Sequence, residues 1–271
     1  MSASDAPAVW VLLRGLSRES GHWGRFPDVL REQIEAQQPG ARLVLLDLPG
    51  NGVLHLQASP TQVPAMVEAC RAELRARGVT GAVHLLAMSL GAMVVSDWVA
   101  RYPREVSGAV LINTTLRPFT AFYRRFRPLN YLALLVLSLT RLGARQREAK
   151  VLSLTTRMLP QADAMLDEWV SLQRKHPVGL RNTLRQVFAA LSYRASRGRP
   201  AAPMLLLCSK ADDVVDWRCS RAISRAWGVP LRLHTKAGHD LPLDDGPWVA
   251  RAVSEWLQMR QMQGLAPGRR H

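Results

Sequence analysis

The sequence predicts an α/β fold, in which helices cover both faces of a mostly parallel central sheet and a helical cap is inserted between its strands. Short apolar segments alternate with amphipathic helical segments, which is the pattern of repeated βαβ units. The alternation stops over residues 116–199 and then resumes. With 271 residues, 48% of them apolar, the chain is long enough for one domain with an insertion. We expect a core domain of residues 1–115 and 200–271 and a cap of residues 116–199.

The first part of the core is predicted to contain four strands and three helices. Ser59, Pro60 and Gln62 suit an N-cap, a first helical position and a capping box at the start of the second helix. Strands are expected where continuous apolar runs end in polar or glycine-rich loops, at residues 8–13, 43–46, 82–86 and 108–112. Helices are expected where apolar residues recur at helical spacing, at residues 26–34, 60–78 and 90–102.

After the first four expected strands, the alternation of strands and helices is interrupted. Residues 116–199 are helical in pattern and basic, and prolines interrupt them. Alternation then resumes, with strands expected at residues 204–208 and 231–234 and helices at residues 217–227 and from Pro247 onward. Its position between two strands makes residues 116–199 an insertion.

The net charge of the chain indicates which classes of partner it could bind. The 36 lysines and arginines exceed the 21 aspartates and glutamates, giving a formal net charge of +15. Such a balance suits nucleic acid or an anionic membrane. Because the sequence has no Cys/His zinc-ligand spacing and no aromatic-rich RNA-recognition pattern, we expect no nucleic-acid binding.

The spacing of the cysteines and the absence of export signals indicate the cellular compartment of the protein. Cys70, Cys208 and Cys219 are odd in number and widely spaced, as expected for buried free thiols in a reducing environment. The first residues lack the pattern of a signal peptide, and the longest uncharged apolar stretch is too short to span a bilayer. The sequence therefore predicts a cytoplasmic protein.

Residues 85–93 carry the first chemical signal. An apolar strand runs into Ala87-Met88-Ser89-Leu90-Gly91 and then into an apolar helix. A nucleophile elbow needs small residues on both sides of its serine, because the serine occupies a strained turn between strand and helix. The usual pattern has glycine at both positions, whereas Ala87 occupies the first here. An ordinary turn is the alternative, so Ser89 needs catalytic partners.

Those partners are expected on loops at the carboxyl ends of neighbouring strands. A serine hydroxyl is a poor nucleophile at neutral pH, so it needs a base, and the base needs a carboxylate to orient it. Loops from separate parallel strands converge at one edge of the sheet. Asp212 follows the expected strand 204–208, and His239 follows the expected strand 231–234.

The three candidate residues occur along the chain in the order Ser89, Asp212, His239, which is the order of the α/β-hydrolase triad. The chain resembles the α/β-hydrolase superfamily over roughly residues 8–115 and 200–260. The resemblance implies an α/β-hydrolase fold, with residues 116–199 corresponding by position to its lid or cap. It rests on five motifs, each after an expected strand: Arg14-Gly15-Leu16, Asp47-Leu48-Pro49-Gly50-Asn51-Gly52, Ala87-Met88-Ser89-Leu90-Gly91, Ala211-Asp212-Asp213-Val214-Val215 and Ala237-Gly238-His239.

The resemblance implies a role for individual residues. Ser89 would attack an acyl carbonyl, His239 would transfer its proton, and Asp212 would orient His239. The backbone N–H groups of Leu16 and Leu90 would form the oxyanion hole. A serine nucleophile is unlike the dehalogenases and epoxide hydrolases of this superfamily, which use aspartate.

Three alternatives accompany these roles. Asp213 is a second candidate for the acid, but Asp212 is favoured because Val214 and Val215 then match the apolar pair of the superfamily. Some hydrolases carry the acid after the preceding strand, where this chain has the neutral Asn113. Arg14 replaces the histidine that is common in the first loop, and its cation could alter loop packing or attract an acidic substrate group.

The remaining polar residues of these loops are expected to be structural. Asp216 is expected to cap a helix and Asp47 to fix its loop, while acidic residues after His239 serve the loop and the last helix: Asp240, Asp244 and Asp245. The other histidines are expected to be structural or solvated: His22, His55, His84, His176 and His234.

The cap offers a hypothesis about substrate. Residues 116–157 contain nine basic side chains and one acid, Glu148, and enclose a leucine-rich run over residues 129–139. Such a run could line a pocket for an acyl or alkyl chain, lie on an anionic membrane surface, or pack on the core as an ordinary helix. We take the apolar pocket as the hypothesis and peripheral membrane contact as its companion.

Taken together, the sequence predicts a serine hydrolase that cleaves a carboxylic ester or thioester without metal or cofactor. One alternative is a catalytically silent scaffold that binds a small ligand or a partner protein, which the intact set of Ser89, Asp212 and His239 argues against. Another is an enzyme of the same fold that performs acyl transfer or C–C bond cleavage. The sequence does not identify the substrate-binding residues.

Overall fold

The computed structural model describes residues 7–120, 143–159 and 162–265. A six-stranded sheet lies at its centre in the order β2-β1-β3-β4-β5-β6, and every neighbouring pair is parallel. All six predicted strands are present. They are β1 (Val9–Leu13), β2 (Arg42–Leu46), β3 (Val83–Met88), β4 (Val106–Ile112), β5 (Met204–Ser209) and β6 (Leu231–His234).

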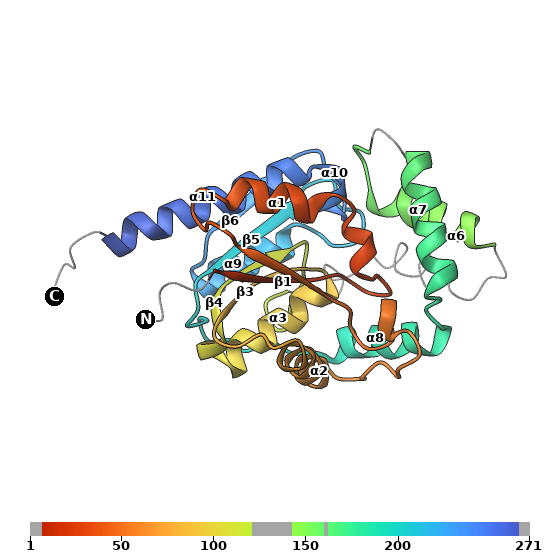
Figure 1. The fold of residues 1–271 in the computed structure, drawn as a ribbon, viewed down its shortest axis with the longest axis horizontal. Coiled ribbons are helices and arrows are strands. Elements are labelled where there is room, and N and C mark those ends of the chain that lie inside the picture. The colour runs from red at the N-terminus through yellow and green to blue at the C-terminus, as the bar shows by residue number, and fades with distance from the viewer. Residues whose placement is uncertain (1–6, 121–142, 160–161, 266–271) are drawn as a thin grey trace.

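Helices cover both faces of the sheet (Figure 1). Successive side chains of a strand point to opposite faces, so Leu12 packs in one apolar cluster and Leu13 in the other. This explains why the strands are continuously apolar. One face carries α1 (Phe26–Ile34) and α11 (Gly246–Leu265), and the other carries α2 (Val63–Ala76), α3 (Leu90–Arg101) and α9 (Arg218–Trp227).

Helix α2 begins later than the sequence predicts. Its first residue is Val63, and its N-cap is the extended Gln62 rather than Ser59. The buried hydroxyl of Ser59 instead donates to the carbonyl oxygen of Pro49 at 2.7 Å and accepts from Nε2 of Gln186 at 2.9 Å. A tertiary contact with the inserted segment therefore replaces the local cap.

The inserted segment is helical where it is described. It contains α6 (Ala144–Thr155), α7 (Ala162–Lys175) and α8 (Leu180–Ser192), which lie together at one end of the molecule (Figure 1). An isolated bridge pairs Arg117 with Arg194 and brings the two ends of the insertion together. The domain boundaries stay a prediction. The leucine-rich run of residues 129–139 lies outside the described residues.

In residues 7–120, 143–159 and 162–265, no helix is long and apolar enough to cross a bilayer.

Candidate active site

The turn between β3 and α3 has a strained serine at its apex. Ser89 has φ 52° and ψ −119°, a conformation that L-residues rarely adopt, and α3 begins at the next residue. Such strain costs on the order of 1–3 kcal/mol and persists only where surrounding contacts impose it. The N–H of Ser89 donates to the carbonyl of Ile112 at 3.0 Å, and Thr114 Oγ1 donates to the carbonyl of Ser89 at 3.2 Å.

Glycine is required at two positions around this turn. A Cβ added at Gly91 would lie 2.5 Å from the carbonyl oxygen of Arg14, and one added at Gly15 would lie 3.0 Å from Cβ of Ser89. The first loop therefore packs directly on the elbow. Ala87 is fully buried, and the turn keeps its strained backbone with alanine at this position.

Asp212 and His239 form a buried pair. Nδ1 of His239 lies 2.8 Å from Oδ2 of Asp212. A carboxylate can only accept, so Nδ1 carries the proton and Nε2 is left to act as a base. The other oxygen of Asp212 accepts from the N–H groups of Val214 and Val215 at 2.7 and 2.9 Å. Asp213, the alternative acid, instead forms an ion pair with Arg157 of the insertion.

The surroundings of His239 act on its charge in opposite directions. Burial and the positive charge of Arg14 disfavour the imidazolium, while the charge and hydrogen bond of Asp212 favour it, with a further contribution from Asp240. The acidic partners prevail, and the pKa of His239 lies above its usual value of 6.5. The histidine is thus held as a stronger base than in water.

Ser89 follows β3, Asp212 follows β5 and His239 follows β6, so all three lie at the carboxyl edge of the sheet, with β4 between β3 and β5. Ser89 is partly exposed. The hydrogen bonds of the described residues include none between Ser89 and His239. Catalytic hydrogen bonds are often formed only when substrate binds, so the open geometry is compatible with a serine and its base.

The two predicted oxyanion donors border the serine. Leu90 is the first residue of α3, and N–H groups in the first turn of a helix have no acceptor within the helix. Leu16 follows Gly15, which packs against the Ser89 side chain. The structure thus places both backbone segments beside Ser89.

Asn113 connects three strand ends. Its Nδ2 donates to the carbonyl of His239 at 2.7 Å, and its Oδ1 accepts from the N–H of Ser209 at 2.8 Å. The position that holds an acid in some hydrolases therefore holds an amide that fixes the histidine loop. The sequence feature that could have predicted this role is an uncharged polar residue directly after a buried strand.

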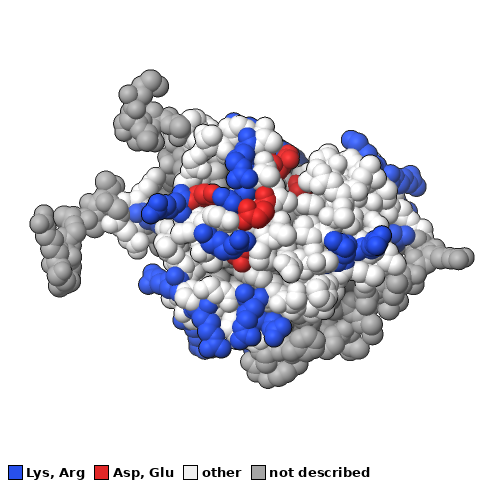
Figure 2. All heavy atoms as spheres, turned by 90° about the horizontal axis from the view of Figure 1, so that it is seen from below, with Lys and Arg blue, Asp and Glu red and all other residues white. Residues whose placement is uncertain are grey.

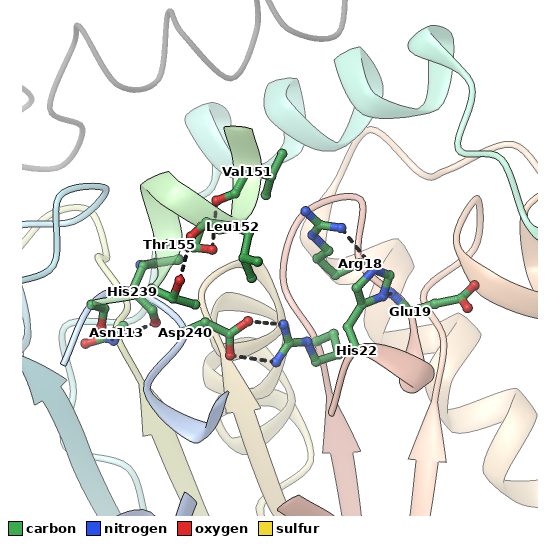
Figure 3. A network of polar contacts seen from close by, with 12 residues as sticks. Arg18, Glu19, His22, Asn113, Val151, Leu152, Thr155, His239 and Asp240 are labelled. Carbon is green, nitrogen blue, oxygen red and sulfur yellow. Dashed lines mark hydrogen bonds and ion pairs between the residues drawn. The ribbon is translucent and has the colours of Figure 1, made fainter. Parts of the chain in front are cut away.

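Arg14 does not face a substrate. It is buried and binds Asp240 through two hydrogen bonds of 3.0 and 2.5 Å, and each side chain is 3% exposed (Figure 3). The expectation that Arg14 could attract an acidic substrate group is therefore wrong, and the one that it alters loop packing is right. Asp240 adjoins His239, so the ion pair joins the first loop to the histidine loop.

A second polar network links the first loop to the insertion. Arg18 lies 2.9 Å from Nε2 of His22 (Figure 3). Arg18 also donates to Glu148 of α6 at 2.6 Å, while Glu19 accepts from His176 at 2.9 Å. Burial, assisted by the charge of Arg18, lowers the pKa of His22 well below its usual value. Burial raises the pKa of Glu19 although His176 opposes it. His22 and His176 are structural, as expected.

The end of α6 rests on the histidine loop. The N–H of Asp240 donates to the carbonyl oxygen of Thr155 at 2.7 Å, and a Cβ at Gly238 would lie 2.7 Å from the same oxygen (Figure 3). Asp244 accepts from the N–H groups of Gly238, Arg157 and Met158. Asp244 thus serves the loop as expected, and also holds the insertion.

Asp216 and Asp245 bind backbone N–H groups at the starts of two helices. Asp216 accepts from the N–H of Arg218 at the start of α9, and Asp245 accepts from the N–H of Trp248 at the start of α11. Within the described ranges, no group of three or more histidine, cysteine or acidic side chains could hold a metal ion. All three cysteines lie in these ranges, are buried and form no disulfide.

Comparison with known proteins identifies relatives. A protein of Cronobacter turicensis named "Putative carbamate hydrolase RutD" is 29% identical over 247 residues, which is 87% of each chain. A membrane phospholipase A described as a bacterial virulence factor has a similar structure, with a TM-score of 0.75, 20% identity and coverage of 95% of this chain and 81% of that one.

An enol-lactonase from Burkholderia xenovorans is similar with a TM-score of 0.73 and 14% identity, over 95% of this chain and 94% of that one. At these identities the solved structures show a common fold. A family model described as the alpha/beta hydrolase family matches residues 10–252. Because this match spans most of the chain, the protein belongs to the alpha/beta hydrolase family and is a hydrolase.

Proposed function

We propose that the protein is a serine hydrolase that cleaves a carboxylic ester or thioester through an acyl-enzyme intermediate, with Ser89 as nucleophile, His239 as base and Asp212 as its partner. The observation that carries the proposal is the strained Ser89 at the end of β3, at the same edge of the sheet as a buried His239–Asp212 pair. A silent scaffold has no need for a strained serine and a buried histidine–aspartate pair at the same edge of the sheet.

In the first step, Oγ of Ser89 attacks the acyl carbonyl and Nε2 of His239 takes its proton. Asp212 stabilises the imidazolium through Nδ1, which its 2.8 Å contact and its two backbone donors allow. His239 then returns the proton to the leaving alcohol or thiol. Water, deprotonated by His239, releases the acid and restores Ser89.

The tetrahedral oxyanion would be bound by the N–H groups of Leu16 and Leu90. Each such donor contributes about 3 kcal/mol to stabilising the transition state. Because both donors belong to the backbone, the arginine in the first loop does not alter this chemistry.

A fluorophosphonate probe tests the proposal directly, since it labels an activated serine covalently. We expect the native chain to be labelled, Ser89→Ala to be inert and His239→Gln to react at least about a hundredfold more slowly. Ser153→Ala is a matched control, because Ser153 is exposed on α6 and its hydroxyl donates only to the carbonyl of Lys150. Undiminished labelling of Ser89→Ala, or no labelling of the native chain, contradicts the proposal.

A panel of substrates tests which acyl groups the protein cleaves. Esters and thioesters with acyl chains of increasing length test the proposed apolar acyl or alkyl part. Carbamates belong in the panel because a relative is named as a carbamate hydrolase, and attack on a carbamate carbonyl passes through the same kind of tetrahedral intermediate. Transfer of the acyl group to an added alcohol would favour the acyltransferase alternative.

A further inference from the structure

Helix α8 faces the protein with Thr183, Gln186 and two alanines, Ala189 and Ala190. Gln186 is fully buried, and its amide donates to Oδ1 of Asn51 at 2.7 Å and accepts from the N–H of Ser17 at 2.8 Å. Thr183 contacts the Ser17 hydroxyl at 3.0 Å. These bonds fix the rotation of α8 about its own axis, so its opposite side must face outward.

The outward side of α8 is apolar. Leu180, Leu184 and Phe188 are 39%, 44% and 59% exposed, and their spacing of four residues places them in one row. Leu56 lies in a neighbouring loop that α8 holds, since Asn182 binds the carbonyls on either side of it, and its own side chain is 89% exposed. A helix that buries glutamine and exposes leucine and phenylalanine is the reverse of an ordinary surface helix.

The segment that carries this row has charge of one sign. Residues 174–199 contain seven lysines and arginines and not a single acidic residue. Arg181 is exposed on α8 beside the apolar row, and Arg174 and Lys175 are exposed at the end of α7. On the face of the molecule seen from below, basic side chains prevail over acidic ones (Figure 2).

We propose that the apolar row of α8 (Leu180, Leu184 and Phe188) and its basic flanks dock the protein on the surface of an anionic phospholipid bilayer. An apolar row enters the boundary between headgroups and acyl chains, while arginines beside it bind lipid phosphates. A second copy of this chain is disfavoured as occupant, because the flanks of both copies carry the same charge. Nucleic acid would match the charge but offer the leucines no apolar contact.

The docking surface is coupled to the candidate active site. Gln186 holds Ser17, which directly follows the proposed oxyanion donor Leu16. A docked α8 would therefore hold the first loop close to the lipid surface, where apolar esters concentrate. The docking proposal itself does not depend on the proposed hydrolysis.

Sedimentation of the purified full-length protein with vesicles tests the docking, and it needs no enzymatic readout. We expect binding to mixed phosphatidylcholine and phosphatidylglycerol vesicles, little binding to phosphatidylcholine alone, and loss of binding at high salt. The double variant Leu184→Gln/Phe188→Gln should lower the partition coefficient at least about tenfold, since burial of each side chain contributes a factor of that order. Arg181→Gln should lower it about fivefold.

Matched controls separate α8 from the rest of the surface. Leu233→Gln/Met262→Gln removes exposed apolar residues from β6 and α11, and Arg251→Gln removes an exposed arginine from α11. We expect these variants to bind like the native chain, and all variants to keep its thermal midpoint. Binding that survives the α8 double variant, equal losses in the controls, or a dimer in light scattering that the double variant abolishes would overturn the proposal.

Discussion

The charge of His239 is controlled by its immediate neighbours. Asp212 and Asp240 favour the protonated ring, and burial and Arg14 oppose it, with a raised pKa as the result. A general base works only in its neutral form. In the proposed mechanism the rate therefore depends on the fraction of His239 that is neutral, which rises as the pH passes this pKa.

We accordingly expect kcat/KM to rise with pH through a midpoint above 6.5, the usual pKa of histidine. The sign follows from the direction of the shift: below the raised pKa the base is protonated and inactive, and above it the base is free. A pH profile with a soluble ester measures the midpoint. In Asp213→Asn it should not move, because Asp213 pairs with Arg157 rather than with His239. A midpoint at or below 6.5 in the native chain would contradict the assignment.

Among the elements, the strands were the most predictable and the contacts of the insertion the least. A strand buried on both faces needs apolar residues throughout, so all six appear in the sequence as continuous runs. The predicted start of α2 was wrong because Ser59 forms a hydrogen bond with Gln186, which is more than a hundred residues away in the sequence. Arg18 and Glu148, or Arg14 and Asp240, are just as distant in sequence, so local patterns could not pair them.

The junction between α6 and the histidine loop gives a prediction for an element. In Gly238→Ala, the new Cβ would meet the carbonyl oxygen of Thr155 and displace the loop that carries His239. Small displacements of catalytic groups are costly, so we expect kcat/KM to fall roughly ten- to a hundredfold. The control is Gly143→Ala at the start of α6, where a Cβ meets nothing within 4 Å. Equal activity of the two variants would show that the loop tolerates the displacement.

At the scale of the whole molecule, one buried ion pair joins segments at opposite ends of the chain. Arg14 follows β1 and Asp240 precedes α10 (Leu241–Asp244), and both are almost fully buried. Burying two charges is costly, and a pair of this kind is stable only while both partners are present.

Arg14→Met should therefore lower the free energy of unfolding by about 3–5 kcal/mol, because it leaves the charge of Asp240 buried and unpaired. The double variant Arg14→Met/Asp240→Leu should recover most of this loss, since an apolar pair of similar volume needs no partner. Urea unfolding of both variants provides the measurement. If the double variant is less stable than Arg14→Met, the pair contributes more than charge compensation.

The order of the strands also has a consequence for synthesis. β4 and β5 are neighbours in the sheet, yet residues 113–203 lie between them in the chain. A ribosome therefore completes the proposed nucleophile, Ser89, long before it makes Asp212 and His239. In the proposed mechanism an unfinished chain therefore carries a serine without its base, and Ser89 becomes reactive only after the last two strands have joined the sheet.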